Sequence, residues 1–353
     1  MVVVEDPTSG VKPAPPAPPS SERLAPPVVA VVVTHDPGPW LEEMLASLGA
    51  QDYPNLSVLV VDAASAVDPL PRVRSVLPGA YVRRLDRNPG FGVAANEVLD
   101  EVEGASFFAL CHDDVLLEPT VVRALVEEAY RSNAGVVGPK VVTWGSPRHL
   151  LQVGLLADKT GVPTPVVERG ELDQEQHDRV RDVFSLPGGC TLVRADLFEV
   201  IGGFDPAIDM FGEDLDLCWR AHVAGARVVV VPVARIQHRE STATQVGADR
   251  RRRLLARHRV RTMLSCYGLL HLVRVLPQAW LLTLVEAAYA VATGDRGRAR
   301  AGLGAWWWNA RRLGGLLRRR RQVRATRRLP DREVRRLQVR GSAVVAALTR
   351  GEV

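Results

Sequence analysis

A continuous run of small apolar residues, VVAVVV at positions 28–33, is the feature of the sequence that most constrains the fold. Five of the six residues are β-branched and no polar residue alternates with them, which predicts a strand buried on both faces, as in a parallel sheet. A second such run, LSVLVV at 56–61, ends at Asp62. Because the first run also ends in a polar loop, at 34–37, we predict a sheet whose polar residues gather at its carboxyl edge.

The rest of the first 240 residues alternates between strand and helix patterns. Further strands are predicted at 80–84, 106–111, 135–142, 184–194 and 227–233, and helices at 40–48, from the turn 88–92 to about 102, at 119–130, 196–201 and 212–225. This alternation favours an α/β fold with a Rossmann-like, mostly parallel sheet flanked by helices. Residues 145–183, rich in Gly, Pro and charge, are predicted to be a loop or lid.

The charge of the chain is divided between its two parts. The net charge of +5 combines 25 Arg and 5 acidic residues in 250–353 with 20 basic and 35 acidic residues in 1–249. A strongly basic end predicts a polyanionic partner, either membrane lipid or nucleic acid. The alternative is a solvated, partly disordered Arg-rich end. We divide the chain into a catalytic domain at 28–245 and an Arg-rich helical tail at 246–353.

The N-terminal residues 1–27 are rich in Pro, Ser and Ala, which predicts a disordered leader. They contain no apolar segment of the kind found in a signal peptide. The four cysteines form no CxxC pair, so we expect reduced thiols and a cytosolic active site.

Two acidic clusters are candidates for chemistry. Asp113 and Asp114 follow a predicted strand, and a hard cation would relieve the repulsion between adjacent carboxylates. The alternative is a pair that caps a helix. Glu213, Asp214 and Asp216 form the second cluster at a predicted helix start, where a carboxylate acts either as a catalytic base or as a partner of the helix dipole.

A histidine and a glycine pair complete the candidates. His238 follows an apolar strand, and it is either a metal ligand or base, or an ordinary surface residue. Gly188 and Gly189 would let a diphosphate or an acceptor approach the backbone closely, although a β-bulge explains them equally well.

Taken in order, seven segments resemble the family-2 glycosyltransferases, which have the GT-A fold. They are VVVTHD at 31–36, VVDAAS at 60–65, NPGFGVAAN at 88–96, HDDVLLEP at 112–119, PGGCTLVRADLFEVIGGFD at 187–205, GEDLDLCWRAHVAG at 212–225 and VVVVPVARIQH at 228–238. The closest likeness is to the non-processive bacterial branch that includes rhamnosyl- and galactofuranosyl-transferases. The QxxRW string of processive synthases is absent from the sequence, which favours the addition of one or few sugars.

The resemblance implies a role for each matching residue. Asp214 would be the general base, with Glu213 beside it, and Asp114 and His238 would hold Mn²⁺ or Mg²⁺. The residues that would bind the nucleotide-sugar donor are Thr34, Asp36, Asp62, Asn88, Asn96, Asp113, Gly188 and Gly189. The sequence departs from the family pattern at His112, where many members have an acidic residue, and at Gly212, where some have an aromatic one.

The function that the resemblance implies is inverting transfer of a sugar from a nucleotide-diphosphate sugar. The acceptor would be a glycan or a polyprenyl-linked glycan of cell-wall or surface polysaccharide synthesis, met at the cytoplasmic face of a bacterial plasma membrane. No nucleic acid partner is expected, and the oligomeric state is left open. Two alternatives are a sugar-1-phosphate nucleotidyltransferase, which the loop 34–37 disfavours because it lacks the Gly-rich pattern, and a non-enzymatic polyanion-binding protein.

The tail contains an apolar stretch at 263–293 that is interrupted by His271, Arg274, Pro277 and Glu286. Because a membrane-spanning helix needs ~20 mostly apolar residues, we predict two amphipathic helices that lie on an anionic membrane surface. Trp280 and the tryptophans at 306–308 would sit among the headgroups, and the Arg runs 311–312 and 318–321 would meet lipid. The alternative is a helical subdomain packed on the catalytic domain.

Overall fold

The computed structural model describes residues 25–339 and 341, apart from the side chains of 242 and 243. The predicted disordered leader therefore lies almost entirely outside the described residues. The strands are β1 (Val28–Thr34), β2 (Leu56–Asp62), β3 (Tyr81–Arg84), β4 (Phe107–His112), β5 (Val115–Leu117), β6 (Ala134–Thr143), β7 (Ser146–Gln152), β8 (Leu155–Ala157), β9 (Pro163–Pro165), β10 (Arg181–Asp182), β11 (Cys190–Arg194) and β12 (Arg227–His238). The helices are α1 (Leu41–Gly49), α2 (Leu70–Val76), α3 (Phe91–Ala95), α4 (Val98–Glu101), α5 (Val121–Arg131), α6 (Ala195–Val200), α7 (Glu213–Val223), α8 (Ser241–Gln245), α9 (Ala248–Cys266), α10 (Leu269–Ala292), α11 (Arg296–Ala310), α12 (Leu313–Thr326), α13 (Asp331–Val334) and the 3₁₀ turn η1 (Arg335–Leu337).

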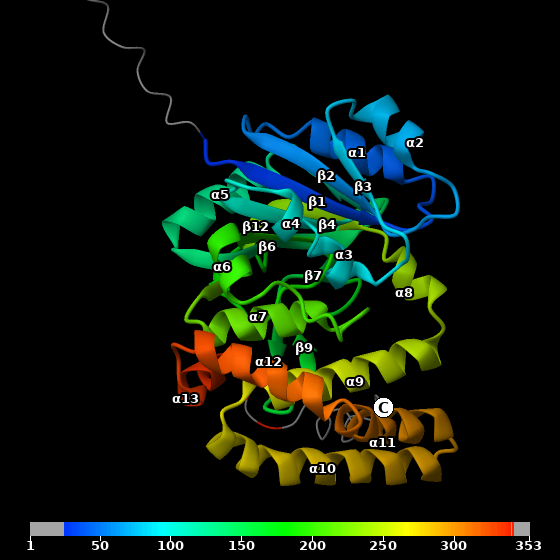
Figure 1. The fold of residues 1–353 in the computed structure, drawn as a ribbon, viewed down its shortest axis with the longest axis vertical. Coiled ribbons are helices and arrows are strands. Elements are labelled where there is room, and N and C mark those ends of the chain that lie inside the picture. The colour runs from blue at the N-terminus through cyan, green and yellow to red at the C-terminus, as the bar shows by residue number, and fades with distance from the viewer. Residues whose placement is uncertain (1–24, 340, 342–353) are drawn as a thin grey trace, which may run out of the picture.

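The central sheet has the strand order β10-β12-β6-β11-β4-β1-β2-β3. The four strands β3, β2, β1 and β4 are parallel neighbours, as predicted. Strand β11 runs antiparallel to both β4 and β6, and β12 is parallel to β6. The sheet is therefore mixed, and helices cover both of its faces (Figure 1).

Strand β1 shows why an unbroken apolar run suits this position. Its even-numbered residues, such as Ala30, pack into a core under α1, α2 and α5. Its odd-numbered residues, such as Val31, pack into a second core with α3, α4, α6 and α7. Because side chains alternate between the two faces of a strand, a strand with a core on each side must be apolar at every position.

The segment 145–183, predicted to be a loop, contains four short strands, β7 to β10, which corrects that prediction. A buried ion-pair group fastens it to the sheet. The ammonium of Lys140, on β6, is fully buried and lies 3.0 Å from Asp173 and also contacts Asp178. Arg235 on β12 approaches the same Asp173 at 2.7 Å. Lysine is rarely buried without a charged partner. Because Lys140 and Arg235 belong to the sheet and Asp173 and Asp178 to the segment, these ion pairs hold the segment against the sheet.

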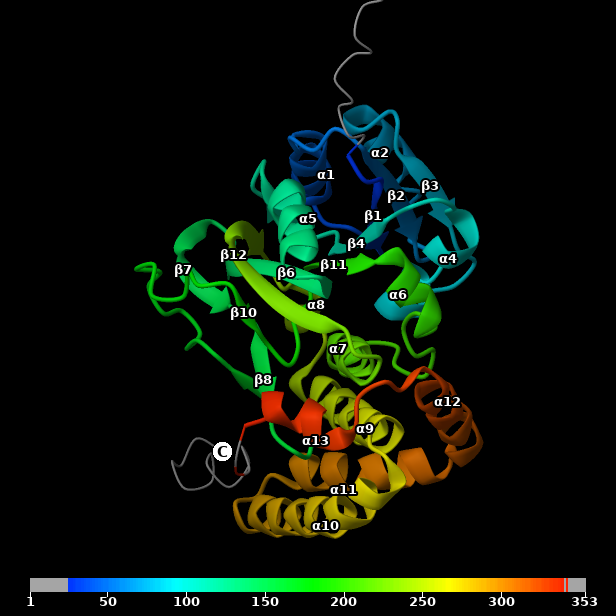
Figure 2. The ribbon, with the colours of Figure 1, turned by 90° about the vertical axis from the view of Figure 1, so that its left-hand side faces the viewer.

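The Arg-rich tail forms a helical layer packed on the catalytic domain, with α9 and α12 beneath α7 and with α10 and α11 outermost (Figures 1 and 2). A third apolar cluster joins Trp219 and Phe184 of the catalytic domain to tail residues such as Tyr267. The predicted lipid contact of the run 318–321 is wrong for two of its members. Arg319 is buried at 4% exposure, and Arg320 donates hydrogen bonds to backbone carbonyl oxygens of the tail itself.

A buried group of charges holds this layer to the domain. Arg261 of α9 donates two hydrogen bonds to Asp205, at 2.7 and 3.1 Å. Arg220 donates to Asp216, four residues before it on α7, at 2.8 Å. Arg319 of α12 lies 3.8 Å from both carboxylates and donates to the carbonyl oxygen of Gly203. All five charged side chains are at most 4% exposed.

Replacing Asp205 by Ala should therefore destabilise the whole chain, because it leaves the guanidinium of Arg261 buried without its carboxylate. We expect a loss of about 3–5 kcal/mol in the free energy of unfolding, measured by urea denaturation. The matched control is Asp196→Ala, which removes an equally close pair with Arg194 (2.6 Å) that is exposed to solvent. That control should cost no more than about 1 kcal/mol, and equal losses would contradict the assignment.

Candidate active site

The predicted polar clusters meet at one edge of the sheet. In the strand register Thr34 lies opposite Asp62, and His112 lies opposite Val33 at the same end of β1. Strand β11 runs the other way, so the loop before it arrives at this edge, where the backbone N–H of His112 donates to the carbonyl oxygen of Gly189 at 2.9 Å. Three parallel strand ends and one antiparallel strand start thus converge.

His112, Asp114 and His238 form a group whose ligand atoms all lie within 4.8 Å of one another. The Oδ1 atom of Asp114 is 3.2 Å from Nε2 of His238 and 3.9 Å from Nδ1 of His112. Its other oxygen accepts hydrogen bonds from the backbone N–H and the hydroxyl of Ser241, both at 2.7 Å. One carboxylate oxygen is thus held in place while the other faces two imidazoles, an arrangement that suits a divalent transition metal.

The electrostatics of the group also suit a cation. Burial alone would raise the pKa of Asp114, but hydrogen bonding and charge from His238, with help from His112 and Ser241, lower it below its usual range. Burial and the neighbouring His238 lower the pKa of His112 to about 4. An ionised carboxylate and a neutral imidazole are the forms that bind metals. Burial, with Asp114 adding to it, raises the pKa of Asp113 to about 6.

The glycine pair brings Asp214 to the same place. A Cβ atom added to Gly188 would lie 3.0 Å from Oδ2 of Asp214 and 3.1 Å from Cε1 of His112. One added to Gly189, whose φ is +121°, would lie 3.2 Å from Nδ1 of His238. Gly188 therefore lies between Asp214 and His112, and Gly189 lies beside His238, so the absence of two side chains leaves room for these groups near one another.

Glu213 and Asp214 are adjacent on α7 but have different surroundings. Burial and the charge of Glu213 raise the pKa of Asp214 well above its usual range, and a hydrogen bond from the backbone of Gly188 partly offsets this. Glu213 is buried instead beside His258 of the tail and Asp209. Of the two predicted catalytic residues, Asp214 thus lies next to Gly188 on the side of His112. The catalytic roles of both residues stay predictions.

The residues predicted near the nucleoside form a connected set at the ends of β1 and β2. Thr34 donates to Asp113 at 2.6 Å. Asp62 is fully buried, accepts from both the backbone and the hydroxyl of Ser65, and lies 3.2 Å from Arg84. Ser65 also accepts a hydrogen bond from the backbone of Asp36, which is in the left-handed region with a φ of 47°. A nucleoside contact by these residues stays a prediction.

The two predicted asparagines lie on the neighbouring segment. Asn88 accepts a hydrogen bond from the backbone N–H of Gly90 at 2.9 Å. Asn96 accepts from the backbone N–H of Phe204 at 2.8 Å and donates to its carbonyl oxygen at 3.1 Å. Asn96 thus pins the turn that leads toward α7. Its predicted contact with the donor stays untested, as does that of Asn88.

His112 is a further candidate ligand, because it lies in the group with Asp114 and His238. In the sequence it stands out only as a departure from the family pattern. The signal was the sequence His112-Asp113-Asp114 at the end of a buried strand, with a second histidine after a later strand. Ser241, which orients Asp114, carried no signal, because it lies 127 positions away in the sequence.

Comparison with known proteins identifies the family. The family model described as "Glycosyltransferase like family 2" matches residues 26–256. An N-acetylglucosaminyl-diphospho-decaprenol L-rhamnosyltransferase of Mycobacterium tuberculosis is 33% identical over 264 residues, covering 66% of this chain and 81% of its own length. The O-antigen biosynthesis protein RfbC of Myxococcus xanthus is 27% identical over 235 residues, which are 64% of this chain and 18% of that protein.

A solved structure has the same fold. The crystal structure of GalNAc-T7 with UDP, GalNAc and Mn2+ superposes with a TM-score of 0.56 at 14% identity, over 78% of this chain and 55% of that one. The chain thus spans about half the length of that protein, and the likeness concerns the fold, which is GT-A. On the family match over residues 26–256 and the relative that is 33% identical, the chain belongs to the family-2 glycosyltransferases.

Proposed function

We propose that the protein is an inverting, metal-dependent glycosyltransferase that moves a sugar from a nucleotide-diphosphate sugar to a lipid-linked glycan. The observation that carries the proposal is the convergence around Gly188 and Gly189, where the carboxylate of Asp214 and the histidines of the metal-binding group border one space. Transfer needs neutralised phosphate charge and a base within the same small volume, and this site supplies candidates for both.

The proposed division of labour follows from the surroundings of each residue. His112, Asp114 and His238 would hold Mn²⁺ or Mg²⁺, which when bound neutralises charge on the diphosphate. Two imidazoles beside one carboxylate favour Mn²⁺ over Mg²⁺, since Mg²⁺ prefers an all-oxygen shell. Asp113, with Thr34, would face the donor from the end of β1.

Asp214 would act as the base in a single displacement. The acceptor hydroxyl loses its proton to the carboxylate, its oxygen bonds to the anomeric carbon, and the bond from that carbon to the diphosphate oxygen breaks. A single displacement inverts the anomeric configuration. Because burial raises the pKa of Asp214, its ionised form is a stronger base than an exposed carboxylate.

The relative from Mycobacterium tuberculosis acts, by its name, on a diphospho-decaprenol glycan. We extend this class of acceptor to the present chain, since the relative is matched over 81% of its length. The enzyme would then work in cell-wall or surface polysaccharide synthesis, at the cytoplasmic face of the plasma membrane. The donor nucleotide would be identified by calorimetric titration of UDP-, GDP- and dTDP-sugars with Mn²⁺.

One prediction concerns the candidate metal site. His238→Ala should weaken Mn²⁺ binding by more than about tenfold, because it removes one of three ligands, and Asp114→Ala should do the same. Calorimetry with Mn²⁺, alone and with each nucleoside diphosphate, measures this. The matched control is His177→Ala, since His177 also faces a carboxylate, Glu171 at 3.0 Å, outside the group. Unchanged Mn²⁺ affinity in His238→Ala would refute the site.

Another prediction concerns the proposed base, Asp214. Asp214→Asn should lower the rate of transfer by about 10²–10⁴-fold while donor binding stays at the wild-type level. Transfer is measured as sugar incorporated into a prenyl-diphosphate-linked N-acetylglucosamine acceptor, and binding by calorimetry. Glu213→Gln, the neighbouring change, should retain much more activity because Glu213 lies beside His258. A normal rate of transfer in Asp214→Asn would show that another group takes the proton.

A further inference from the structure

Helix α10 carries a broad apolar face that no part of the described chain covers. Along one side its large apolar residues are 39–87% exposed, and they recur at the three- and four-residue spacing of one helix face. They are Leu269, Leu270, Val273, Trp280, Leu281, Leu284, Val285, Tyr289 and Val291. An apolar surface of this size on one exposed helix indicates an interaction site.

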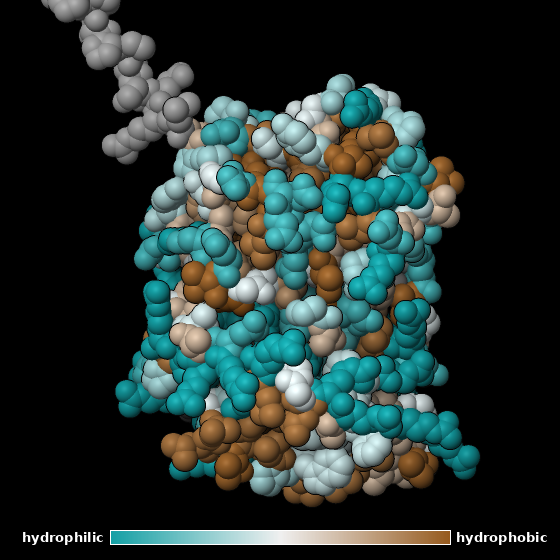
Figure 3. Space-filling model, in the orientation of Figure 1, coloured by the Kyte–Doolittle hydropathy of each residue, from teal (hydrophilic) through white to brown (hydrophobic). Residues whose placement is uncertain are grey.

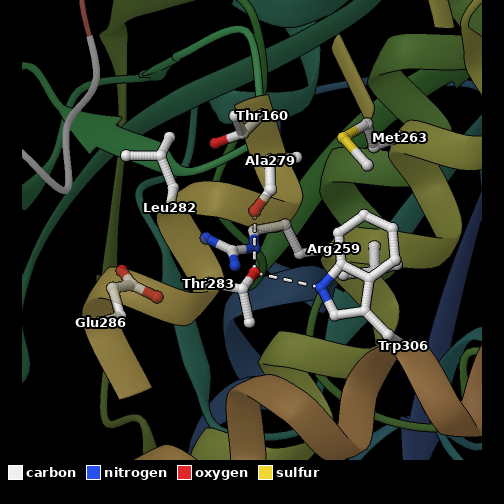
Figure 4. Close-up of a pocket in the computed structure, with 9 residues that line it drawn as sticks. Thr160, Arg259, Met263, Ala279, Leu282, Thr283, Glu286 and Trp306 are labelled. Atoms are coloured by element: carbon white, nitrogen blue, oxygen red, sulfur yellow. Dashed lines mark hydrogen bonds between the residues drawn. The ribbon is translucent and has the colours of Figure 1, made fainter. Parts of the chain in front are cut away.

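The opposite side of α10 is packed into the protein. Leu272, Val275 and Ala279 belong to the apolar cluster shared with α7 and α9, and Ala287 and Ala290 pack against α11. Figure 4 shows the link between these helices, where Nε1 of Trp306 donates to the hydroxyl of Thr283 at 3.0 Å, and that hydroxyl donates to the Ala279 carbonyl oxygen at 2.9 Å. Trp306 therefore points inward, which corrects its predicted place among headgroups.

By length and composition α10 is the one helix among the described residues that could cross a membrane. Crossing would strip its inner face from α9 and α11 and would break the Trp306–Thr283 hydrogen bond. It would also place Arg274 and Glu286 in the hydrocarbon, where charged side chains are costly. The packing of the tail therefore favours a helix that lies parallel to a membrane surface.

The neighbouring helix α11 adds the chemistry of a headgroup layer. Its exposed residues Arg300, Leu303 and Trp307, together with Arg311 just after its end, follow one another at three- and four-residue spacing, so they share one face. The guanidinium of Arg311 lies 5.5 Å from the ring centre of Trp307, which is 64% exposed. Tryptophan and arginine side by side suit the boundary between acyl chains and anionic phosphates.

Exposed arginines lie on the same layer of helices as the apolar face. Figure 3 shows apolar residues gathered over the lower end of the molecule, at α10, with hydrophilic residues above them. Arg274, Arg296, Arg312 and Arg318 are exposed on the same layer of helices. Anionic lipid complements this charge, whereas a second copy of the chain would bring like charges together.

We propose that the outer face of α10, with the exposed stripe of α11, docks in the plane of an anionic membrane without spanning it. This inference deepens the proposed function, since a lipid-linked acceptor would be presented at such a surface. It rests on the proposed function for the biological role of docking, whereas the docking face itself is argued from the structure. Helix α10 shares an apolar cluster with α7, the helix of Asp214.

The test is flotation of the full chain with vesicles of phosphatidylcholine, with and without phosphatidylglycerol, in the absence of metal, donor and acceptor. We expect the wild-type protein to float with the anionic vesicles and to be released by alkaline carbonate. Val273→Glu combined with Leu281→Glu should reduce the bound fraction at least about tenfold. The matched control combines Val200→Glu with Val233→Glu, which are equally exposed valines of the catalytic domain, and should float normally.

Outcomes other than those expected above would overturn the proposal. Absence of flotation, or equal effects of the two double variants, would show that α10 is not the docking face. Resistance to carbonate would show a spanning helix. A dimer in light scattering that Val273→Glu with Leu281→Glu separates, without flotation, would assign the face to a second copy. Asp214→Asn should float like the wild type, so a failed glycosyltransferase assignment is distinguishable from failed docking.

Discussion

The charges buried between α7 and the tail are the constraint on which the rest of the structure depends. Asp205 and Asp216 lie in the catalytic domain, and two of their arginine partners, Arg261 and Arg319, come from helices that begin after residue 247. A buried carboxylate without its partner is strongly unfavourable, so the domain cannot bury this side of α7 alone. The arginines of the tail are in this sense part of the interior of the catalytic domain.

That packing decides where the candidate base lies. Helix α7 has one side against the sheet, through residues such as Leu217 and Cys218, and another against the tail, through Leu215 and Trp219. With both sides held, its first turn brings Asp214 next to Gly188, which also adjoins His112. His258 of α9 reinforces this, since it hydrogen-bonds to the carbonyl oxygen of Phe211 just before the helix.

The division of charge along the chain has two physical outcomes in the fold. Some arginines of the tail neutralise acidic residues of the domain, as Arg261 does with Asp205. Others, such as Arg300 and Arg311, stay on the surface of the outer helices beside exposed apolar residues. The same excess of basic residues thus contributes to internal packing and to the surface that we propose for the membrane.

The sequence by itself determined the family and the main strands and helices of the catalytic domain, but not the four short strands within 145–183. Strand β1 could be predicted because its apolar run follows directly from burial on both faces, and Asp114, His238 and Asp214 could be named because each follows or begins a recognisable element. Only the tertiary structure decided that His112 lies beside Asp114 and His238, that Asn96 binds the backbone of Phe204, and that β11 runs antiparallel. The same holds for the inward turn of Trp306 and Arg319. The physical reason is that the local pattern reports whether a side chain prefers burial, whereas its partner comes from another element of the fold, as when Asn96 binds Phe204, 108 positions away.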